Sequence, residues 1–246
     1  MSLRVGFDLD GVLADLNEAL VRQARLTFPD ADLKATPPVV DASPPSDAAD
    51  AADREPGEVS PSSLSLTSRQ ERQLWAEVKR TPNFWESLDE TEPGIVKRLA
   101  DTARAERWEV IFLTSRPKSD GDIVQIQSQR WLRAKGFEMP SVFVVATSRG
   151  KIAASLELDV VVDDRPENCL DIAIDSKARA ILIWRGDQNA VPASARRLGI
   201  GGVPSVAACL DLLVEAGKPG AGQTSLVDRL KRLLGLKPGE PQRARA

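Results

Sequence analysis

The chain has 246 residues, of which 42% are hydrophobic, and this is enough for one substantial core with an accessory unit. The net charge of −3 gives no overall basic field that would attract nucleic acid, and no apolar run approaches the roughly 18 residues of a membrane span. A predicted strand begins at once, which leaves no room for a signal peptide, and the two cysteines, Cys169 and Cys209, suit a reducing compartment. We therefore expect a cytoplasmic protein that binds neither nucleic acid nor a membrane. The sequence leaves a homodimer open.

Histidine and tyrosine are both absent from the chain. Their absence excludes histidine-based triads, zinc sites with histidine ligands and tyrosine nucleophiles. Any chemistry must therefore use carboxylate, hydroxyl, amine or guanidinium groups.

The predicted elements begin with a strand at 3–8 and a helix at about 15–28. Residues 35–68 then contain six prolines, no aromatic side chain and a surplus of acid. Such a segment cannot bury enough apolar surface to offset the entropy of ordering, so we predict a disordered loop there. Further helices are predicted to begin near 68 and 95 and to span about 122–135, 167–176 and 205–216. Further strands are predicted at 108–113, 142–145, 158–162, 181–184 and near 202.

Strands that alternate with helices of this length predict an α/β fold with a doubly wound parallel sheet. Beyond it, residues 218–246 include leucines at helical spacing from about 224 and then a polar, basic end. This segment predicts an amphipathic helix and a disordered tail. Docking of the helix on its own domain is favoured over a role at a partner or membrane surface.

Asp8 and Asp10 end the first predicted strand, just before a turn at Gly11. Because alternate residues of a strand share a face, both carboxylates would lie at the carboxyl edge of the sheet, where open α/β folds bind ligands. Two carboxylates at such a short distance repel each other unless they share a proton or bind a cation. Oxygen ligands favour a hard ion such as Mg²⁺. The alternative is an Asp-Gly turn with an incidental second acid.

Polar residues stand at three further positions that are predicted to meet at this edge. They are Thr114, Ser115 and Arg116, then Lys151, then Asp163 and Asp164. The first group is expected to bind substrate, because hydroxyls and N–H groups at a helix start hold phosphate oxygens. The lysine would place positive charge against phosphate and nucleophile, and the acid pair would complete a Mg²⁺ site. Asp8 could then attack a phosphoryl group while Asp10 acts as acid and base.

This ordered set resembles the four motifs of the haloacid dehalogenase (HAD) superfamily of phosphatases, and the chain is most similar to the 5'(3')-deoxyribonucleotidase family. The matching segments are 8–15, 28–30, 84–88, 92–94, 113–115 and 162–166. The resemblance implies a core formed by 1–15 and 108–217, with 16–107 as a small helical cap that selects the substrate. It also implies that Asp8, the Asp10 backbone carbonyl and Asp164 hold Mg²⁺.

The chain departs from the nucleotidase pattern where a nucleobase would stack. Leu16 replaces an aromatic residue after the first motif, and the proline-rich insertion lacks a second aromatic cluster. Phe84 and Trp85 remain as candidate stacking residues, with packing inside the cap as the alternative. The chain therefore matches the family pattern better at the catalytic centre than at the base pocket.

These features predict a Mg²⁺-dependent phosphomonoesterase that works through an aspartyl-phosphate, with nucleoside monophosphates as the leading substrate class. A phosphatase for another small phosphate ester, or for a polynucleotide 3'-phosphate, is the second hypothesis. A non-catalytic scaffold that binds a partner is the third, and the clustered acids weigh against it.

Overall fold

The computed structural model describes residues 2–29, 58, 61, 64–145, 147–187, 190–218 and 234. Most of the predicted loop at 35–68, and all of the predicted C-terminal segment except residues 218 and 234, lie outside the described residues. Leu234 packs against the larger apolar cluster of the core.

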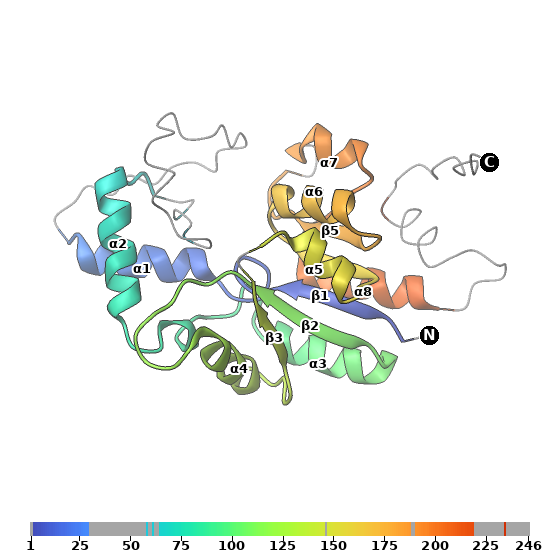
Figure 1. Ribbon diagram of the computed structural model, residues 1–246, viewed down its shortest axis with the longest axis horizontal. Helices are drawn as coiled ribbons and strands as arrows, with labels where there is room; N and C mark the ends of the chain where they lie inside the picture. The colour runs from blue at the N-terminus through green and yellow to red at the C-terminus, as the bar shows by residue number, and fades with distance from the viewer. Residues whose placement is uncertain are drawn as a thin grey trace.

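A six-stranded, entirely parallel sheet forms the centre of the molecule (Figure 1). The strands are β1 (Arg4–Asp8), β2 (Glu109–Thr114), β3 (Ser141–Val144), β4 (Val160–Asp163), β5 (Arg179–Ile183) and β6 (Gly201–Val203). Their spatial order is β3-β2-β1-β4-β5-β6, so the chain winds outward from β1 first in one direction and then in the other. The predicted fold class, a doubly wound parallel sheet, is confirmed.

Helices occupy the connections between these strands. They are α1 (Leu16–Thr27), α2 (Ser68–Arg80), the short 3-10 helix η2 (Phe84–Glu86), α3 (Ile95–Glu106), α4 (Val124–Ala134), α5 (Arg149–Ser155), α6 (Pro166–Asp175), α7 (Ala193–Arg197) and α8 (Val206–Gly217). The sequence does not predict α5 and α7, because helices this short do not establish a periodic apolar pattern.

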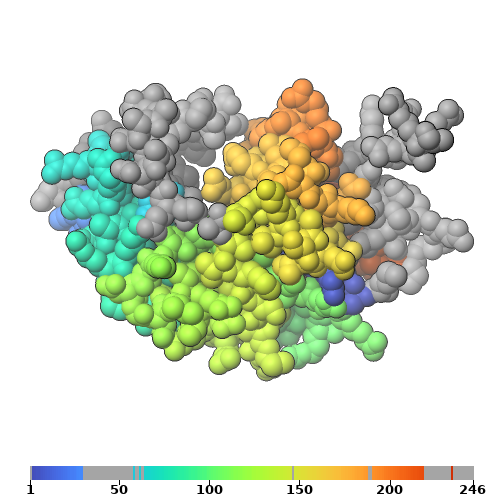
Figure 2. Space-filling model, viewed as in Figure 1, coloured from blue at the N-terminus to red at the C-terminus, as the bar shows by residue number. Residues whose placement is uncertain are grey.

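The sheet is buried on both faces by two apolar clusters. Val160 and Val162 belong to one cluster and Val161 to the other, as expected for alternating side chains of a central strand. The first cluster includes residues of α3, α4 and α8, and the second includes residues of α5, α6 and α7. The segments that contain α4 and β3 adjoin those of α5 and α6 on the face drawn in Figure 2.

The helices of the segment predicted as a cap, 16–107, pack against different partners. Helices α1 and α2 contact each other and lie beyond the carboxyl end of β1 (Figure 1). Helix α3 instead contacts α8, and Arg98 reaches Asp211 at 2.5 Å, so α3 packs with the core. The boundary of the cap at 16–107 stays a prediction. Within the described residues, no helix combines the length and apolar character that a membrane crossing needs.

Candidate active site

A tight turn follows β1 and carries Asp10. The N–H of Gly11 donates to the carbonyl of Ala14 at 2.9 Å, and Leu13 and Ala14 both donate to the carbonyl of Leu9 at 2.8 Å. Gly11 has φ +81°, and a Cβ there would lie 2.0 Å from Asp164 Oδ2. Only glycine fits this position, because it accepts positive φ and leaves room for the carboxylate.

Two side chains from elsewhere in the chain hold the turn in place. Thr91 Oγ1 donates to the carbonyl of Val12 at 2.6 Å, and Arg185 Nη1 donates to the carbonyl of Gly11 at 2.5 Å. Arg185 follows β5 and was missed by the sequence analysis. Its position just after a parallel strand was the only signal for it, since such strand ends meet at one edge.

Asp8 is buried at the end of β1 and is paired with a buried guanidinium. Arg149 Nη2 lies 2.6 Å from Asp8 Oδ1, and the Arg149 side chain is only 6% exposed. Burial raises the pKa of the Asp8 carboxyl well above its usual 3.8; Arg149 opposes this, and Asp163 and Asp164 add to it. One arginine therefore faces more negative charge than it can balance.

Asp163 and Asp164 differ in their hydrogen bonds. The carboxylate of Asp163 accepts from the backbone N–H of Arg165 at 2.9 Å and from Asn168 Nδ2 at 3.0 and 3.1 Å. Asp164 Oδ1 is buried and has no hydrogen-bond partner. Burial, followed by the charge of Asp163, raises the pKa of Asp164 from 3.8 to about 7. The carboxylate of Asp163 is thus hydrogen-bonded to other groups of the protein, whereas Oδ1 of Asp164 has no partner.

Asp10 lies in a different environment, because Arg116 donates hydrogen bonds to both oxygens of its carboxylate. Arg116 Nε lies 3.0 and 2.9 Å from Oδ1 and Oδ2, and Nη2 lies 2.8 Å from Oδ1. Thr114 Oγ1 also donates to Oδ2 at 3.3 Å. The structure therefore brings Asp8, Asp10, Thr114 and Arg116 together at the carboxyl ends of β1 and β2.

Lys151 is not brought into this cluster. It lies on α5 with an exposed side chain, and Arg149, two residues earlier, makes the contact with Asp8. Residues two apart on an α-helix point in nearly opposite directions, so only one of them can face the sheet edge. Recognising Ser148 as a helix cap, which accepts from the N–H of Lys151, could have indicated this choice.

The two aromatic candidates for base stacking are buried. Phe84 is 4% exposed and Trp85 is 0% exposed, and Trp85 Nε1 donates to the carbonyl of Pro117 at 3.1 Å. Both belong to the larger apolar cluster. In this arrangement their rings pack inside the protein and do not offer a free face to a base, which corrects the stacking role expected for them.

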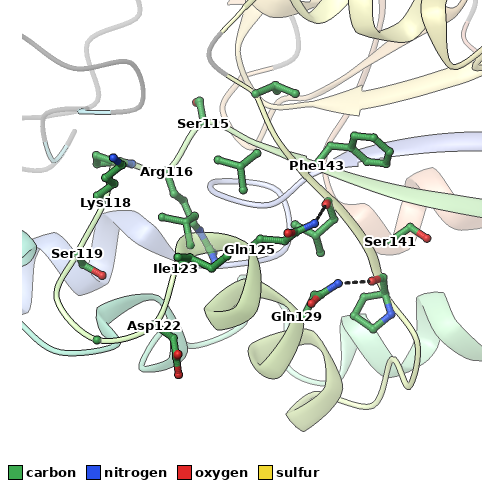
Figure 3. A pocket seen from close by; sticks show the side chains of 17 residues that line it. Ser115, Arg116, Lys118, Ser119, Asp122, Ile123, Gln125, Gln129, Ser141 and Phe143 are labelled. Atoms are coloured by element: carbon green, nitrogen blue, oxygen red, sulfur yellow. Dashed lines mark hydrogen bonds between the residues drawn. The ribbon is translucent and has the colours of Figure 1, made fainter.

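A cavity of about 1110 Å³ begins beside Ser115, at the carboxyl end of β2 (Figure 3). It is lined by the loop after β2, by α4 and by the edge strand β3, including Phe143, which is 40% exposed. The side chains of Gln125 and Gln129 line it and donate to the carbonyls of Val142 and Pro140. The cavity thus lies next to the carboxylate cluster and has mixed polar and apolar walls.

No family model and no curated protein matches the chain. A "predicted phosphatase" from Clostridium acetobutylicum is similar in structure with a TM-score of 0.52 and 13% identity, over 87% of this chain and 99% of that one. A "putative beta-phosphoglucomutase" from Thermotoga maritima is similar with a TM-score of 0.50 and 17% identity, also over 87% and 99%. The chain therefore shares the overall fold of these two proteins. At these identities the likeness concerns the fold alone, and the deoxyribonucleotidase resemblance stays a prediction.

The acidic residues at this edge of the sheet suit a divalent cation. The described residues contain no group of three or more Asp, Glu, His or Cys side chains that could hold a metal. A site formed by two carboxylates and a backbone carbonyl does not require such a group. The unpartnered Oδ1 of Asp164 and the uncompensated charge around Asp8 are the features that a hard cation would satisfy. Asp8 and Asp164 therefore fit the expected Mg²⁺ ligands, and Asp163 does not.

Proposed function

We propose that the protein is a phosphomonoesterase that forms a covalent intermediate on Asp8. The observation that carries the proposal is the contrast between two aspartates separated by one residue. Asp8 is buried against a single guanidinium in an excess of acid, and Asp10 is held by both of its oxygens. A nucleophile next to a positioned acid and base is what a two-step displacement at phosphorus requires.

In the first step, an oxygen of Asp8 forms a bond to phosphorus as the bond from phosphorus to the leaving oxygen breaks. In the form of the enzyme that carries a proton on Asp10, this proton passes to the leaving oxygen, so an alcohol departs and an aspartyl-phosphate remains. In the second step Asp10 takes a proton from water as the water oxygen attacks phosphorus, which releases phosphate and restores Asp8. Each step moves one proton through the same carboxyl group.

Two other residues are placed to bind the phosphoryl group. Arg149 Nη1 is buried without a hydrogen-bond partner beside Asp8, so it can donate to a phosphate oxygen. Ser115 is half-buried at the start of the cavity. Thr114 is engaged with Asp10 and with the backbone N–H of Arg116, which leaves Ser115 as the hydroxyl for substrate. The role expected for Lys151 thereby passes to Arg149.

A Mg²⁺ ion would be held by the carboxylates of Asp8 and Asp164 and by the backbone carbonyl of Asp10. When bound, it would supply positive charge against the phosphate oxygens and the crowded acids.

Nucleoside monophosphates remain the leading substrate class within this proposal. Their support is the family resemblance of the sequence, together with a cavity that starts at Ser115 and is large enough for a nucleoside. Since Phe84 and Trp85 are buried, Phe143, which is 40% exposed, is the aromatic residue in the lining of the cavity.

The test is phosphate release with and without Mg²⁺ across a panel of nucleotides, sugar phosphates and a DNA 3'-phosphate. Selective, Mg²⁺-dependent release from nucleoside monophosphates is the expected result. Release from other esters alone would retain the reaction and reject the nucleotide. No release from any member of the panel, with correctly folded protein, would reject the phosphatase and favour a binding scaffold.

A further inference from the structure

Arg116 forms a contact that an ordinary substrate-binding arginine would not. Its side chain is 0% exposed, and three of its contacts within 3.0 Å go to the carboxylate of Asp10. The remaining terminal nitrogen, Nη1, donates to Ser128 Oγ at 2.9 Å. Every nitrogen of the guanidinium therefore has a partner inside the protein.

The guanidinium is itself fixed by two aromatic rings. Its central carbon lies 4.9 Å from the ring centroid of Trp85 and 5.9 Å from that of Trp131. Trp85 Nε1 donates to Pro117 and Trp131 Nε1 donates to Leu88, so hydrogen bonds also orient both rings. Aromatic faces at this distance attract a guanidinium and restrict its plane.

These contacts form a continuous chain that links four separate segments of the protein and ends at Asp10. The rings come from η2 and α4, Ser128 comes from α4, Arg116 follows β2 and Asp10 follows β1. A flexible carboxylate would sample several rotamers, whereas a two-pronged contact with a fixed guanidinium defines its plane. The plane of the Asp10 carboxylate is therefore fixed by a guanidinium that packs near Trp85 and Trp131.

We propose that Arg116 is a positioning residue that holds Asp10 in line for proton transfer to the leaving oxygen, and that it does not bind the phosphate. The inference rests on the proposed phosphatase function. Its chemical consequence is selective. Loss of the contact slows esters whose leaving oxygen needs a proton, and has little effect on esters whose leaving group departs as a stable anion.

The experiment compares the wild type and Arg116→Lys on an alkyl phosphate and on p-nitrophenyl phosphate, with Mg²⁺ present. Lysine keeps the positive charge but cannot donate to both carboxylate oxygens of Asp10 in one plane. We expect kcat/KM to fall about 100-fold for the alkyl ester and less than about 5-fold for the nitrophenyl ester, as for loss of a general acid. Inhibition by inorganic phosphate should change less than about 2-fold, since the phosphate contacts remain.

Arg130→Lys is the matched control, because Arg130 is an exposed arginine on α4 paired with Glu86 and Asp122. It should leave both esters and phosphate inhibition unchanged. Equal losses for both esters in Arg116→Lys, together with weakened phosphate inhibition, would overturn the proposal and make Arg116 a phosphate ligand.

Ser128→Ala provides a second variant should Arg116→Lys fail to fold. It removes one hydrogen bond to the guanidinium and should reduce the alkyl ester rate by about 3-fold with no loss for the nitrophenyl ester. A Ser128→Ala enzyme that treats both esters alike would contradict the inference. Failure of the wild type to release phosphate from either ester would instead overturn the proposed function, and this inference with it.

Discussion

Asp8 and Asp10 lie two residues apart, yet the protein surrounds them in opposite ways. Asp10 is matched with one guanidinium that contacts both of its oxygens and serves no other acid. Asp8 shares Arg149 with Asp163, which lies 4.0 Å from Arg149 Nε, and the charge of Asp164 also acts on it. We refer below to Asp10 with Arg116 as the paired half and to Asp8, Asp163, Asp164 and Arg149 as the acidic half.

The difference indicates which part of the site is already complete. The paired half has satisfied hydrogen bonds and a balanced charge, so it is pre-organised without a ligand. The acidic half has three carboxylates around the buried Arg149 and an oxygen without a partner, although Arg165 and Arg185 also act on Asp164. It can become balanced by taking up protons or by binding a cation.

The largest expected effects come from neutralising one aspartate in each half. Asp8→Asn and Asp10→Asn should both lower turnover by large factors, at least about 10⁴-fold for the nucleophile. Their stabilities without Mg²⁺ should change in opposite directions at neutral pH. Asp8→Asn should raise the free energy of unfolding, because it removes a charge that burial disfavours. Asp10→Asn should lower it by about 2–4 kcal/mol, because it leaves buried Arg116 without its counter-ion.

Urea unfolding monitored by tryptophan fluorescence measures both changes. Asp211→Asn, at an exposed ion pair between α3 and α8, is the control and should alter neither activity nor stability appreciably. A loss of stability of similar size in both site variants would show that the two halves do not differ in charge balance.

The next prediction separates the two cations of α5. Arg149→Gln should lower the free energy of unfolding by about 3–5 kcal/mol, because it leaves buried acids without compensation. Lys151→Gln is the matched control on the same helix, and its exposed side chain should be worth less than about 0.5 kcal/mol. Turnover should follow the same order. A greater loss of turnover in Lys151→Gln would return the role of phosphate-facing cation to the lysine.

The acidic half also predicts a pH dependence of stability. Because the pKa of Asp164 is raised from 3.8 to about 7, the folded state binds this proton more tightly than the unfolded chain does. The resulting stability is fully present below pH 3.8 and is lost as the pH rises through about 7. Asp164→Asn should remove this loss. The free energy of unfolding of the variant should therefore rise relative to that of the wild type by on the order of 2–4 kcal/mol between pH 4 and pH 8.

Urea unfolding of both proteins at several pH values, without divalent cations, measures that gain. Added Mg²⁺ should stabilise the wild type more at pH 8 than at pH 5 and should have little effect on Asp164→Asn. A stability difference that stays constant with pH would show that Asp164 is not held in its protonated form.

The fold could be predicted from the sequence to a large extent. All six strands were expected near their observed positions, because central parallel strands are short apolar runs bounded by turns and helices. The division between cap and core was less accessible. The apolar face of α3 predicts burial but not the surface that buries it, and its contact with α8 joins residues more than 100 positions apart.

The meeting of these acids at one edge of the sheet could be predicted, but not their partners. Asp8, Asp10 and Asp164 are candidate site residues because their positions at strand ends are a local feature of the chain. The pairing of Asp8 with Arg149 depends on where a seven-residue helix begins. The role of Arg116 depends on Trp131 and on Trp85, which the sequence offered as a ligand contact and which the fold uses in packing.

The smallest predicted effect concerns the turn that joins the two halves. Gly11 and Gly94 have similar positive φ angles, +81° and +78°, but a Cβ would meet Asp164 only at Gly11 and would meet nothing within 4 Å at Gly94. Gly94→Ala therefore measures the backbone strain alone, and Gly11→Ala adds the displacement of the Asp164 carboxylate. We expect Gly11→Ala to be less stable than Gly94→Ala by about 1–3 kcal/mol and to lose Mg²⁺-induced stabilisation, which Gly94→Ala should keep. Equal destabilisation with Mg²⁺ response intact in both variants would mean that Asp164 can move away from the turn without consequence, and the acidic half would then not depend on the position of Gly11.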